Sequence, residues 1–153
     1  MSSNVRYRNA EKDDIPQMLA LWRCFWKAQP YEANLPRKIE KDADLVVVAE
    51  CDGNVVGTVI GGWDEWWPWV YRVAVHPDYQ RRGIGSNLLA EIHRRLKARG
   101  ADGAGLFTPP SNEAMRALLA KIGYKERYDQ RFSFVFERGE SRPDRCRSAG
   151  TGE

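Results

Sequence analysis

The stretch that decides the fold runs from Val70 to Gly100 and reads VYRVAVHPDYQRRGIGSNLLAEIHRRLKARG. Its first six residues are rich in β-branched and aromatic side chains, which is typical of a strand. The strand ends at His76-Pro77-Asp78, and the loop that follows contains Gly83 and Gly85. Apolar residues then recur at helical spacing up to Gly100, a residue typical of the position just past a helix end. We therefore expect a strand, a glycine-containing loop and a helix, in that order.

A glycine loop before a helix has a physical use. Glycines lack a Cβ atom, so Gly83 and Gly85 let a ligand approach the backbone closely. The first N–H groups of a helix have no partner within it and lie at the positive end of its dipole, so they favour phosphate. Arg81 and Arg82 add positive charge. The loop therefore predicts a multiply anionic ligand, but it is neither a GxxxxGK(S/T) nor a GxGxxG phosphate motif.

Length and composition suit a single folded domain. The chain has 153 residues, of which 42% are hydrophobic and 11% aromatic, enough for a sizeable core. No apolar run approaches the roughly 20 residues of a membrane span, and no basic-then-apolar leader opens the sequence. We therefore expect a cytoplasmic protein without a membrane partner. The formal charge of +3 is too small to indicate nucleic acid as a partner.

The three cysteines, Cys24, Cys51 and Cys146, are widely spaced and form no CxxC pair. This spacing favours neither a disulfide framework nor a zinc site, so we expect no metal. Cys24 and Cys51 are most simply core residues.

The rest of the chain alternates strand and helix signals. Helices are expected from Ile15, with an apolar face reaching Trp26, around 38–41, and from a Ser111 cap to Gly123. Strands are expected at 5–8, 45–50, 55–60, 104–107 and 132–136, with a tight turn at Asp52-Gly53-Asn54 between the second and third of these. The residues from 138 onward are rich in Gly, Ser, Pro and charge, which predicts a flexible C-terminal tail.

Residues 63–69 read WDEWWPW, the most unusual composition in the chain. Four tryptophans in a short connection cannot all be buried, so we expect some of them to face a cleft or a partner. An acceptor pocket, a homodimer surface and packing under the connection all remain open.

Two motifs resemble the GNAT superfamily, the GCN5-related N-acetyltransferases, in its small single-domain bacterial form. The segment VHPDYQRRGIG matches the family's acetyl-CoA motif, Q/R-x-x-G-x-G/A, after a strand and before a helix. The segment NEAMRALLAKIGY resembles the late signature N-x-x-A-x-x-F/L-Y-x-K-x-G-F/Y, with Asn112, Lys121, Gly123 and Tyr124 in matching places. The likeness covers roughly Val5 to Phe136.

The resemblance implies an α/β (α+β) fold. In the family, a mixed, mostly antiparallel central sheet is flanked by helices and splays where the cofactor enters. Here the splay would lie between the strands at 70–75 and 104–107. The domain would occupy residues 1–137, followed by the tail at 138–153.

The resemblance also implies acetyl-CoA as co-substrate and assigns residues to it. The pantetheine arm would pair with the backbone of Val73, Ala74 and Val75 and contact Asn112, while Lys121 would reach the nucleotide phosphates. The pyrophosphate would lie on the loop, formed by Gln80, Arg81, Arg82, Gly83, Ile84, Gly85 and Ser86.

Catalysis is where the sequence departs from the family pattern. The family's tyrosine, often proposed to protonate the departing thiolate, aligns with Leu119, which cannot donate a proton. A thiol of pKa about 8.5 is a good leaving group, so the loss is tolerable, and Tyr124, Tyr71 or a water are candidate acids. Backbone N–H groups near Arg72 and Val73 would polarise the thioester carbonyl.

An acceptor amine must lose a proton before it attacks, so a base within reach is expected. Glu65 is the first candidate, with Asp64 and His76 as alternatives. The residues expected to bind the acceptor are Trp26, Trp63, Asp64, Trp66 and Trp67.

The sequence thus predicts an acetyl-CoA-dependent N-acetyltransferase that acts on a primary amine of a small molecule or of a protein or peptide N-terminus, by direct transfer in a ternary complex. Two alternatives stay open. One is a non-catalytic acyl-CoA-binding or sensing module, and the other is a phosphate-binding regulator that ignores CoA.

Overall fold

Five strands form one sheet in the order β1-β2-β3-β4-β5, in a computed structural model that describes residues 4–127. The strands are β1 Val5–Asn9, β2 Val46–Cys51, β3 Asn54–Gly62, β4 Trp69–Val75 and β5 Gly105–Leu106. Neighbours from β1 to β4 are antiparallel, and β5 runs parallel to β4. The expected mixed, mostly antiparallel sheet flanked by helices is confirmed.

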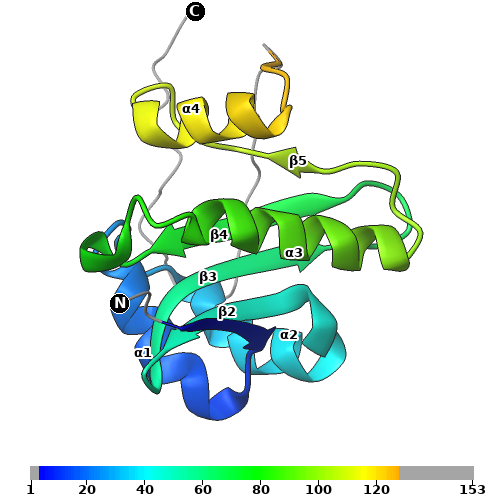
Figure 1. Cartoon of the computed structure of the whole chain (residues 1–153). Coiled ribbons are helices and arrows are strands. Elements are labelled where there is room, and N and C mark those ends of the chain that lie inside the picture. Colours follow the sequence, from blue (N-terminus) through cyan, green and yellow to red (C-terminus); the bar gives the residue numbers. More distant parts are fainter. Residues whose placement is uncertain (1–3, 128–153) are drawn as a thin grey trace, which may run out of the picture.

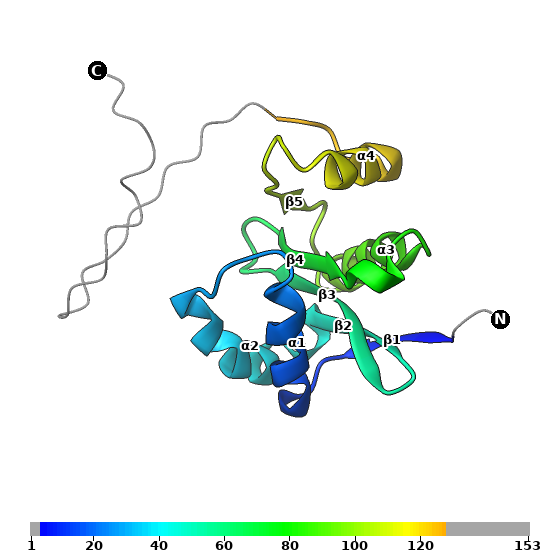
Figure 2. The same ribbon diagram turned by 90° about the vertical axis from the view of Figure 1, so that its left-hand side faces the viewer.

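Helices cover both faces of this sheet (Figures 1 and 2). One face carries α1 Ile15–Trp22 and α2 Leu35–Lys41, and the other carries α3 Ile84–Ala98. Beyond the β4 edge, α4 Glu113–Ile122 lies beside β5 (Figure 1). Short 3-10 helices lie at Lys12–Asp14, Pro30–Asn34, Ala43–Leu45 and Pro77–Tyr79.

The central strands are buried on both sides, which gives the core two layers. Alternate residues of β2 point to opposite faces of the sheet. Val47 and Ala49 pack with Leu88, Leu89 and Ile92 of α3, among others. Val46 and Val48 pack on the α1 and α2 side, where Met18 and Trp22 are also buried. This explains why β2 reads as a continuous apolar run rather than as an alternating one.

The glycine signals are confirmed. Gly100 follows α3 with a φ of +98°, and Gly123 follows α4 with a φ of +112°. In the tight turn between β2 and β3, Asp52 and Gly53 both have positive φ, which is the conformation that such hairpins require.

Three expectations are corrected. The first helix ends at Trp22 instead of reaching Trp26, because the N–H groups of Cys24 and Phe25 bond three residues back and tighten the chain into a turn. Cys24 is therefore exposed rather than in the core, whereas Cys51 is buried as expected. The cap of α4 is Asn112, whose side chain accepts from the N–H of Met115, and not Ser111.

The strand expected at 104–107 is shorter, at Gly105–Leu106. The strand expected at 132–136 and the tail at 138–153 lie outside the described residues.

A partly buried ion pair ties β1 to the start of α1. The guanidinium of Arg8 donates to both carboxylate oxygens of Asp14, at 2.7 and 2.8 Å, and the N–H of Glu11 donates to the same carboxylate at 2.7 Å. Asp14 is buried, yet these bonds outweigh the effect of burial. The hydrogen bond from Arg8 is the largest cause that holds the pKa of Asp14 below its ordinary value.

We expect Asp14→Asn to lower the free energy of unfolding at neutral pH. We also expect the variant to lose less of that free energy than wild type when the pH falls. A carboxylate with a lowered pKa stabilises the fold above its unfolded pKa of about 3.9, and this stability is lost as the pH falls through the lower folded pKa. The pair is partly buried and Arg8 keeps its bond to Glu50, so the loss of the Asp14 carboxylate should cost about 1–3 kcal/mol at pH 7. Urea unfolding at pH 7 and pH 3 measures both effects. The exposed neighbour Asp13 offers a control, since Asp13→Asn should change neither the stability at pH 7 nor its loss in acid. An Asp14→Asn protein that loses as much stability in acid as wild type would contradict this role of Asp14.

Candidate functional site

The sheet opens on one side of β4. Only Trp69 and Val70 of β4 pair with β5 among the described residues, and β4 continues to Val75 without β5 beside it. The expected splay between these two strands is therefore present. Helix α4 lies on this side of the sheet, beyond β4 (Figure 1). Unpaired backbone groups along a strand edge are a ready template for an extended ligand.

Aromatic rings pack together where β4 and β5 are still paired. The ring of Trp69 stacks on Phe107 with centroids 4.8 Å apart and meets Trp67 edge-on at 6.0 Å. Gly105 lies under these rings so closely that a Cβ atom added there would be 2.7 Å from Cζ3 of Trp69. The N–H of Gly105 also donates to the carbonyl of Pro68 at 2.9 Å. The junction between β4 and β5 is thus a tightly packed point.

A β-bulge interrupts β4 in the middle of the open edge. The register with β3 shifts between Thr58 and Ile60, opposite Arg72 and Val73. Arg72 has a φ of +51°, which is rare for a residue with a side chain. The bulge sends the Arg72 side chain to the α1 face, where its guanidinium carbon lies 4.5 Å from the ring centroid of Trp26. Val73 and Ala74, which follow it, are buried.

The loop after β4 ends in a helix terminus without a side-chain cap. Gln80 donates to the carbonyl of Val75 at 3.2 Å and so ties the loop to the strand end. Gly83 has a φ of +79° and begins α3, whose first helical bond runs from Asn87 N–H to the carbonyl of Gly83. The amides of Ile84, Gly85 and Ser86 precede that bond and have no acceptor within the helix.

The two arginines of the loop are exposed. Arg81 has a φ of +62°. Arg82 donates to the carbonyl of Asp78 and lies over the ring of Tyr79 at 5.0 Å. Together they make the end of the loop strongly positive, which complements the helix dipole.

Helix α4 reaches the same loop. A Cβ atom added at Gly85 would be 3.2 Å from the Cδ2 atom of Leu118, so the two helices approach closely at this point. Lys121 lies on α4 one turn after Leu118 and is exposed. The carboxamide oxygen of Asn112 caps α4 by accepting from Met115 N–H at 3.1 Å. The two late-signature residues thus lie on an element that borders the loop.

Leu119, which aligns with the family's tyrosine, and the candidate acid Tyr124 both lie against α3. Leu119 is buried in the core. The hydroxyl of Tyr124 meets Nε2 of His93 at 2.5 Å, and burial raises the pKa of Tyr124 to about 12 and lowers the pKa of His93. Tyr124 therefore holds its proton at neutral pH, but it faces the middle of α3. Its role as an acid stays a prediction.

The Trp-rich segment divides into packed and exposed parts. Trp63 packs against the α3 side of the core and donates to the carbonyl of Arg99 at 3.2 Å. Trp66 is 88% exposed and Trp67 51%, so the four tryptophans are not all buried. That the exposed ones face a cleft or a partner stays a prediction. Asp64 accepts from the N–H groups of both, which shapes the turn and lowers its pKa. Glu65 lies exposed in this turn with a φ of +66°.

On the α1 face of the bulge, Arg72 meets the segment 29–36, a contact that the sequence did not predict. The guanidinium of Arg72 donates to the hydroxyl of Tyr31 at 2.6 Å and lies 3.7 Å from Oε1 of Glu32. The Glu32 side chain is only 9% exposed, and its hydrogen bond from Arg23 is the largest cause of its lowered pKa. Tyr71, half-exposed, lies on the same face, and its pKa is raised by burial and by the charge of Asp64. The segment 29–36 and β4 are far apart in sequence, so no local pattern indicates this contact.

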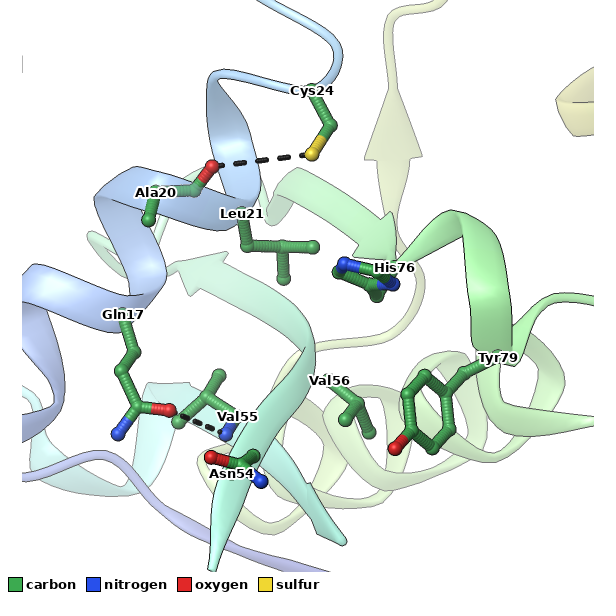
Figure 3. Close-up of a pocket in the computed structure, with 9 residues that line it drawn as sticks. All are labelled: Gln17, Ala20, Leu21, Cys24, Asn54, Val55, Val56, His76 and Tyr79. Carbon is green, nitrogen blue, oxygen red and sulfur yellow. Dashed lines mark hydrogen bonds between the residues drawn. The ribbon is translucent and has the colours of Figure 1, made fainter.

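One groove lies between α1, the start of β3 and the turn after β4, and His76 is the one candidate residue that lines it (Figure 3). It has a volume of about 340 Å³. Several of its polar groups are already bonded: Gln17 accepts from Val55 N–H, Cys24 lies near the carbonyl of Ala20, and His76 accepts from Asp78 N–H. His76 thus serves its own turn, in keeping with the His-Pro reading of the sequence.

Within residues 4–127 no group of three or more His, Cys, Asp or Glu side chains is arranged to hold a metal ion. The same part of the chain contains no helix with the length and apolar character needed to span a membrane.

Comparison with known proteins supports the same reading. A model of the acetyltransferase (GNAT) family matches residues 15–124. A curated relative, acetyltransferase plu1384 of Photorhabdus laumondii, is 34% identical over 133 residues, which is 85% of this chain and 93% of the relative.

Solved structures share the fold. The aminoglycoside N-acetyltransferase AAC(6')-Iy in complex with CoA superimposes with a TM-score of 0.69 at 22% identity, over 90% of this chain and 97% of that one. A GNAT family acetyltransferase from Brucella melitensis in complex with acetyl-CoA gives a TM-score of 0.60 at 22% identity, over 81% and 84% of the two chains.

Proposed function

The chain belongs to the acetyltransferase (GNAT) family, and from this premise we propose that it transfers the acetyl group of acetyl-CoA directly to a primary amine. The acceptor is a small molecule or the N-terminus of a protein or peptide. Solved structures of the same fold hold CoA or acetyl-CoA, and one of these proteins is named for an aminoglycoside acceptor.

The observation that carries this proposal is the open edge of β4 leading to the uncapped start of α3. An extended amide-containing arm fits a strand edge, and a pyrophosphate fits a glycine-bearing helix N-terminus flanked by Arg81 and Arg82. Acetyl-CoA has both parts in this order. In our proposal its pantetheine arm pairs with the backbone of Val73 to Val75, and its pyrophosphate lies on Gln80 to Ser86.

Transfer in the ternary complex requires a neutral amine. The amine nitrogen forms a bond to the thioester carbon, the carbon–sulfur bond breaks, and the amine proton passes to a base. CoA leaves as a thiolate, which needs little help because its thiol pKa is about 8.5. The burial of Leu119 is therefore compatible with catalysis.

The acceptor approaches, in our proposal, from the α1 face of the bulge. Exposed aromatic rings gather there, with Tyr31 at 58% and Tyr71 at 47% exposed, beside the partly buried Trp26. Trp66 and Trp67 extend the apolar surface, and Asp64 and Glu65 supply negative charge for an ammonium group. This favours an apolar or aromatic amine, or a peptide end.

Glu65→Gln should lower kcat by about a hundredfold if Glu65 is the general base. Release of free CoA thiol from acetyl-CoA, measured with a panel of amines and N-terminal peptides, gives the rate. Asp64→Asn is a matched control, because asparagine keeps the oxygen that accepts from Trp66 and Trp67 but loses the charge. We expect this control to raise the KM for the acceptor and to leave kcat near wild type; equal losses of kcat in both variants would count against a base at Glu65.

Leu119 motivates one rival function, a module that binds acyl-CoA without turnover. The thiol-release panel separates the two, since amine-dependent release excludes a pure binding module. Ligand protection against thermal unfolding tests the cofactor itself: CoA should stabilise the protein more than ATP at equal concentration, and equal protection would remove the CoA assignment.

A further inference from the structure

A buried chain of side-chain hydrogen bonds runs from α1 through β3 to the bulge of β4. The indole Nε1–H of Trp22 donates to Oγ1 of Thr58 at 2.9 Å, and that hydroxyl donates to the carbonyl of Arg72 at 2.8 Å. Trp22 is 2% exposed and Thr58 is fully buried. The first of these bonds is therefore closed to water, and the second is partly buried.

The direction of each bond follows from chemistry. An indole N–H can only donate, so the hydroxyl of Thr58 must accept from Trp22. Its single hydrogen is then free for one acceptor, and the carbonyl of Arg72 takes it. Thr58 is also the polar exception in an apolar stretch of β3, where Val56, Val59 and Ile60 are all buried. Valine would fill the same space, so the hydroxyl matters for these bonds rather than for packing.

Because of the bulge, the bond from Thr58 determines how the backbone is oriented at Arg72. In a regular ladder the partner strand fixes each peptide group, but the register shifts here between Thr58 and Ile60. Arg72 lies in the bulge with positive φ, and its carbonyl bonds to a side chain of β3. The orientation of the peptide between Arg72 and Val73 thus depends on the Thr58 hydroxyl.

That orientation determines where the next N–H points. The described chain has no cis peptide bonds, and in a planar trans peptide the carbonyl oxygen and the following N–H point in opposite directions. Since the Arg72 oxygen points to Thr58 of β3, the Val73 N–H points away from β3. On that side the pairing of β4 with β5 has ended at Val70, so the N–H faces the opening.

We infer that Thr58 is a positioning residue, which holds the Arg72–Val73 peptide so that the Val73 N–H donates to the carbonyl oxygen of the bound acetyl group. The inference rests on the proposed function, because it requires acetyl-CoA in the opening. The carbonyl oxygen gains negative charge as the amine attacks, and a donor already aimed at it stabilises that charge without reorganisation.

The Arg72 side chain reinforces the same geometry. Its guanidinium carbon lies 4.5 Å from the Trp26 ring centroid and 5.4 Å from that of Trp22, and its Nη2 atom donates to the Tyr31 hydroxyl. Trp22 thus contacts the bulge twice, once through Thr58 and once through the arginine. Helix α1 serves as the rigid support of the bulge.

The test compares Thr58→Val with Thr58→Ser by infrared spectroscopy of bound acetyl-CoA carrying ¹³C at the thioester carbonyl. A hydrogen bond to the carbonyl lowers its stretching frequency, so wild type should shift the band below its value in water. In Thr58→Val most of that shift should be lost, and kcat should fall by about tenfold, because the donor is misdirected rather than removed. Serine keeps the hydroxyl, so Thr58→Ser should retain the shift and stay within about threefold of the wild-type kcat.

Affinity for CoA separates a local effect from a general structural defect, because a general defect would weaken CoA binding. CoA lacks the acetyl carbonyl, so Thr58→Val should bind CoA as wild type does while it loses the infrared shift. If Thr58→Val does not fold, Trp22→Phe removes the indole donor and leaves the hydroxyl free to turn away from Arg72, and a smaller shift than wild type is expected.

Three results would overturn the inference. They are an unshifted carbonyl band in wild type, a folded Thr58→Val with the wild-type band, and a Thr58→Ser as impaired as Thr58→Val. The infrared measurement needs no acceptor amine. A shifted band without amine-dependent turnover would therefore contradict the proposed transfer reaction but not the role of Thr58.

Discussion

Replacing Gly83 with alanine is expected to weaken acetyl-CoA binding by about tenfold to a hundredfold. Gly83 has a φ of +79°, and no atom within 4 Å would meet an added Cβ, so the protein itself has room for a methyl group there. In our proposal that space belongs to the pyrophosphate, which bonds to the backbone N–H groups beside it. Each hydrogen bond to a charged group contributes about 1.5–3 kcal/mol, and about 1.4 kcal/mol is a factor of ten in affinity.

Gly53 provides a closely matched control. It has a φ of +78° and also has nothing within 4 Å of an added Cβ, but it lies in the turn between β2 and β3. Alanine at either position should cost the fold about 1–2 kcal/mol, because both backbones are left-handed. Titration calorimetry with CoA and urea unfolding separate the effects. We expect both variants to lose the same amount of stability, and only Gly83→Ala to bind CoA more weakly. Unchanged CoA affinity in Gly83→Ala would show that the loop is not part of the binding site.

Gly105→Val is expected to lower kcat/KM by more than about a hundredfold. The new Cβ would lie 2.7 Å from Cζ3 of Trp69 and 3.0 Å from Nε1 of Trp67, so the rings or the strand must move. Because β5 pairs with β4 at only two residues, we expect the pairing to give way and the opening to change shape. A displacement of about 1 Å at a reacting group costs about a hundredfold in rate.

The effect should be local, because Gly105 lies at the edge of the sheet and the core between α1 and α3 does not depend on it. Gly103→Val is the matched control: it lies two residues earlier, with nothing within 4 Å of an added Cβ. Hydrogen exchange of the amide at position 105, which donates to the carbonyl of Pro68 in the wild type, is measured together with thiol release and checks both. Lost turnover with wild-type protection of this amide would mean that the packed junction is not the cause.

The glycine and periodicity signals predicted α3 well, since Gly83 and Gly100 mark its two ends and its apolar spacing is regular. The strands from β1 to β4 were predictable for the same reason, because β-branched runs bounded by turn residues have few alternatives. The acetyl-CoA loop was predictable from its motif. Its relation to α4 was only implied, since the contact of Gly85 with Leu118 joins two distant helices.

The parts that escaped prediction depend on distant contacts. Helix α1 ends early, and Trp26 beyond it packs against Arg72, some 46 residues later in the chain. Thr58 reads as an ordinary strand residue, and only the fold reveals its bonds to Trp22 and Arg72. Asp64 reads as a candidate for binding an amine, but its carboxylate also shapes the turn before β4.

The measurement that tests the central claim most directly is a mass balance of the reaction with ¹³C-acetyl-CoA and the amine that releases thiol fastest. Direct transfer predicts one N-acetylated acceptor for each CoA thiol released, and a protein mass that does not change at any time. Thiol release that yields free acetate, an acetylated protein intermediate, or tight acetyl-CoA binding with no acetylated amine across a broad panel would contradict direct transfer to an amine.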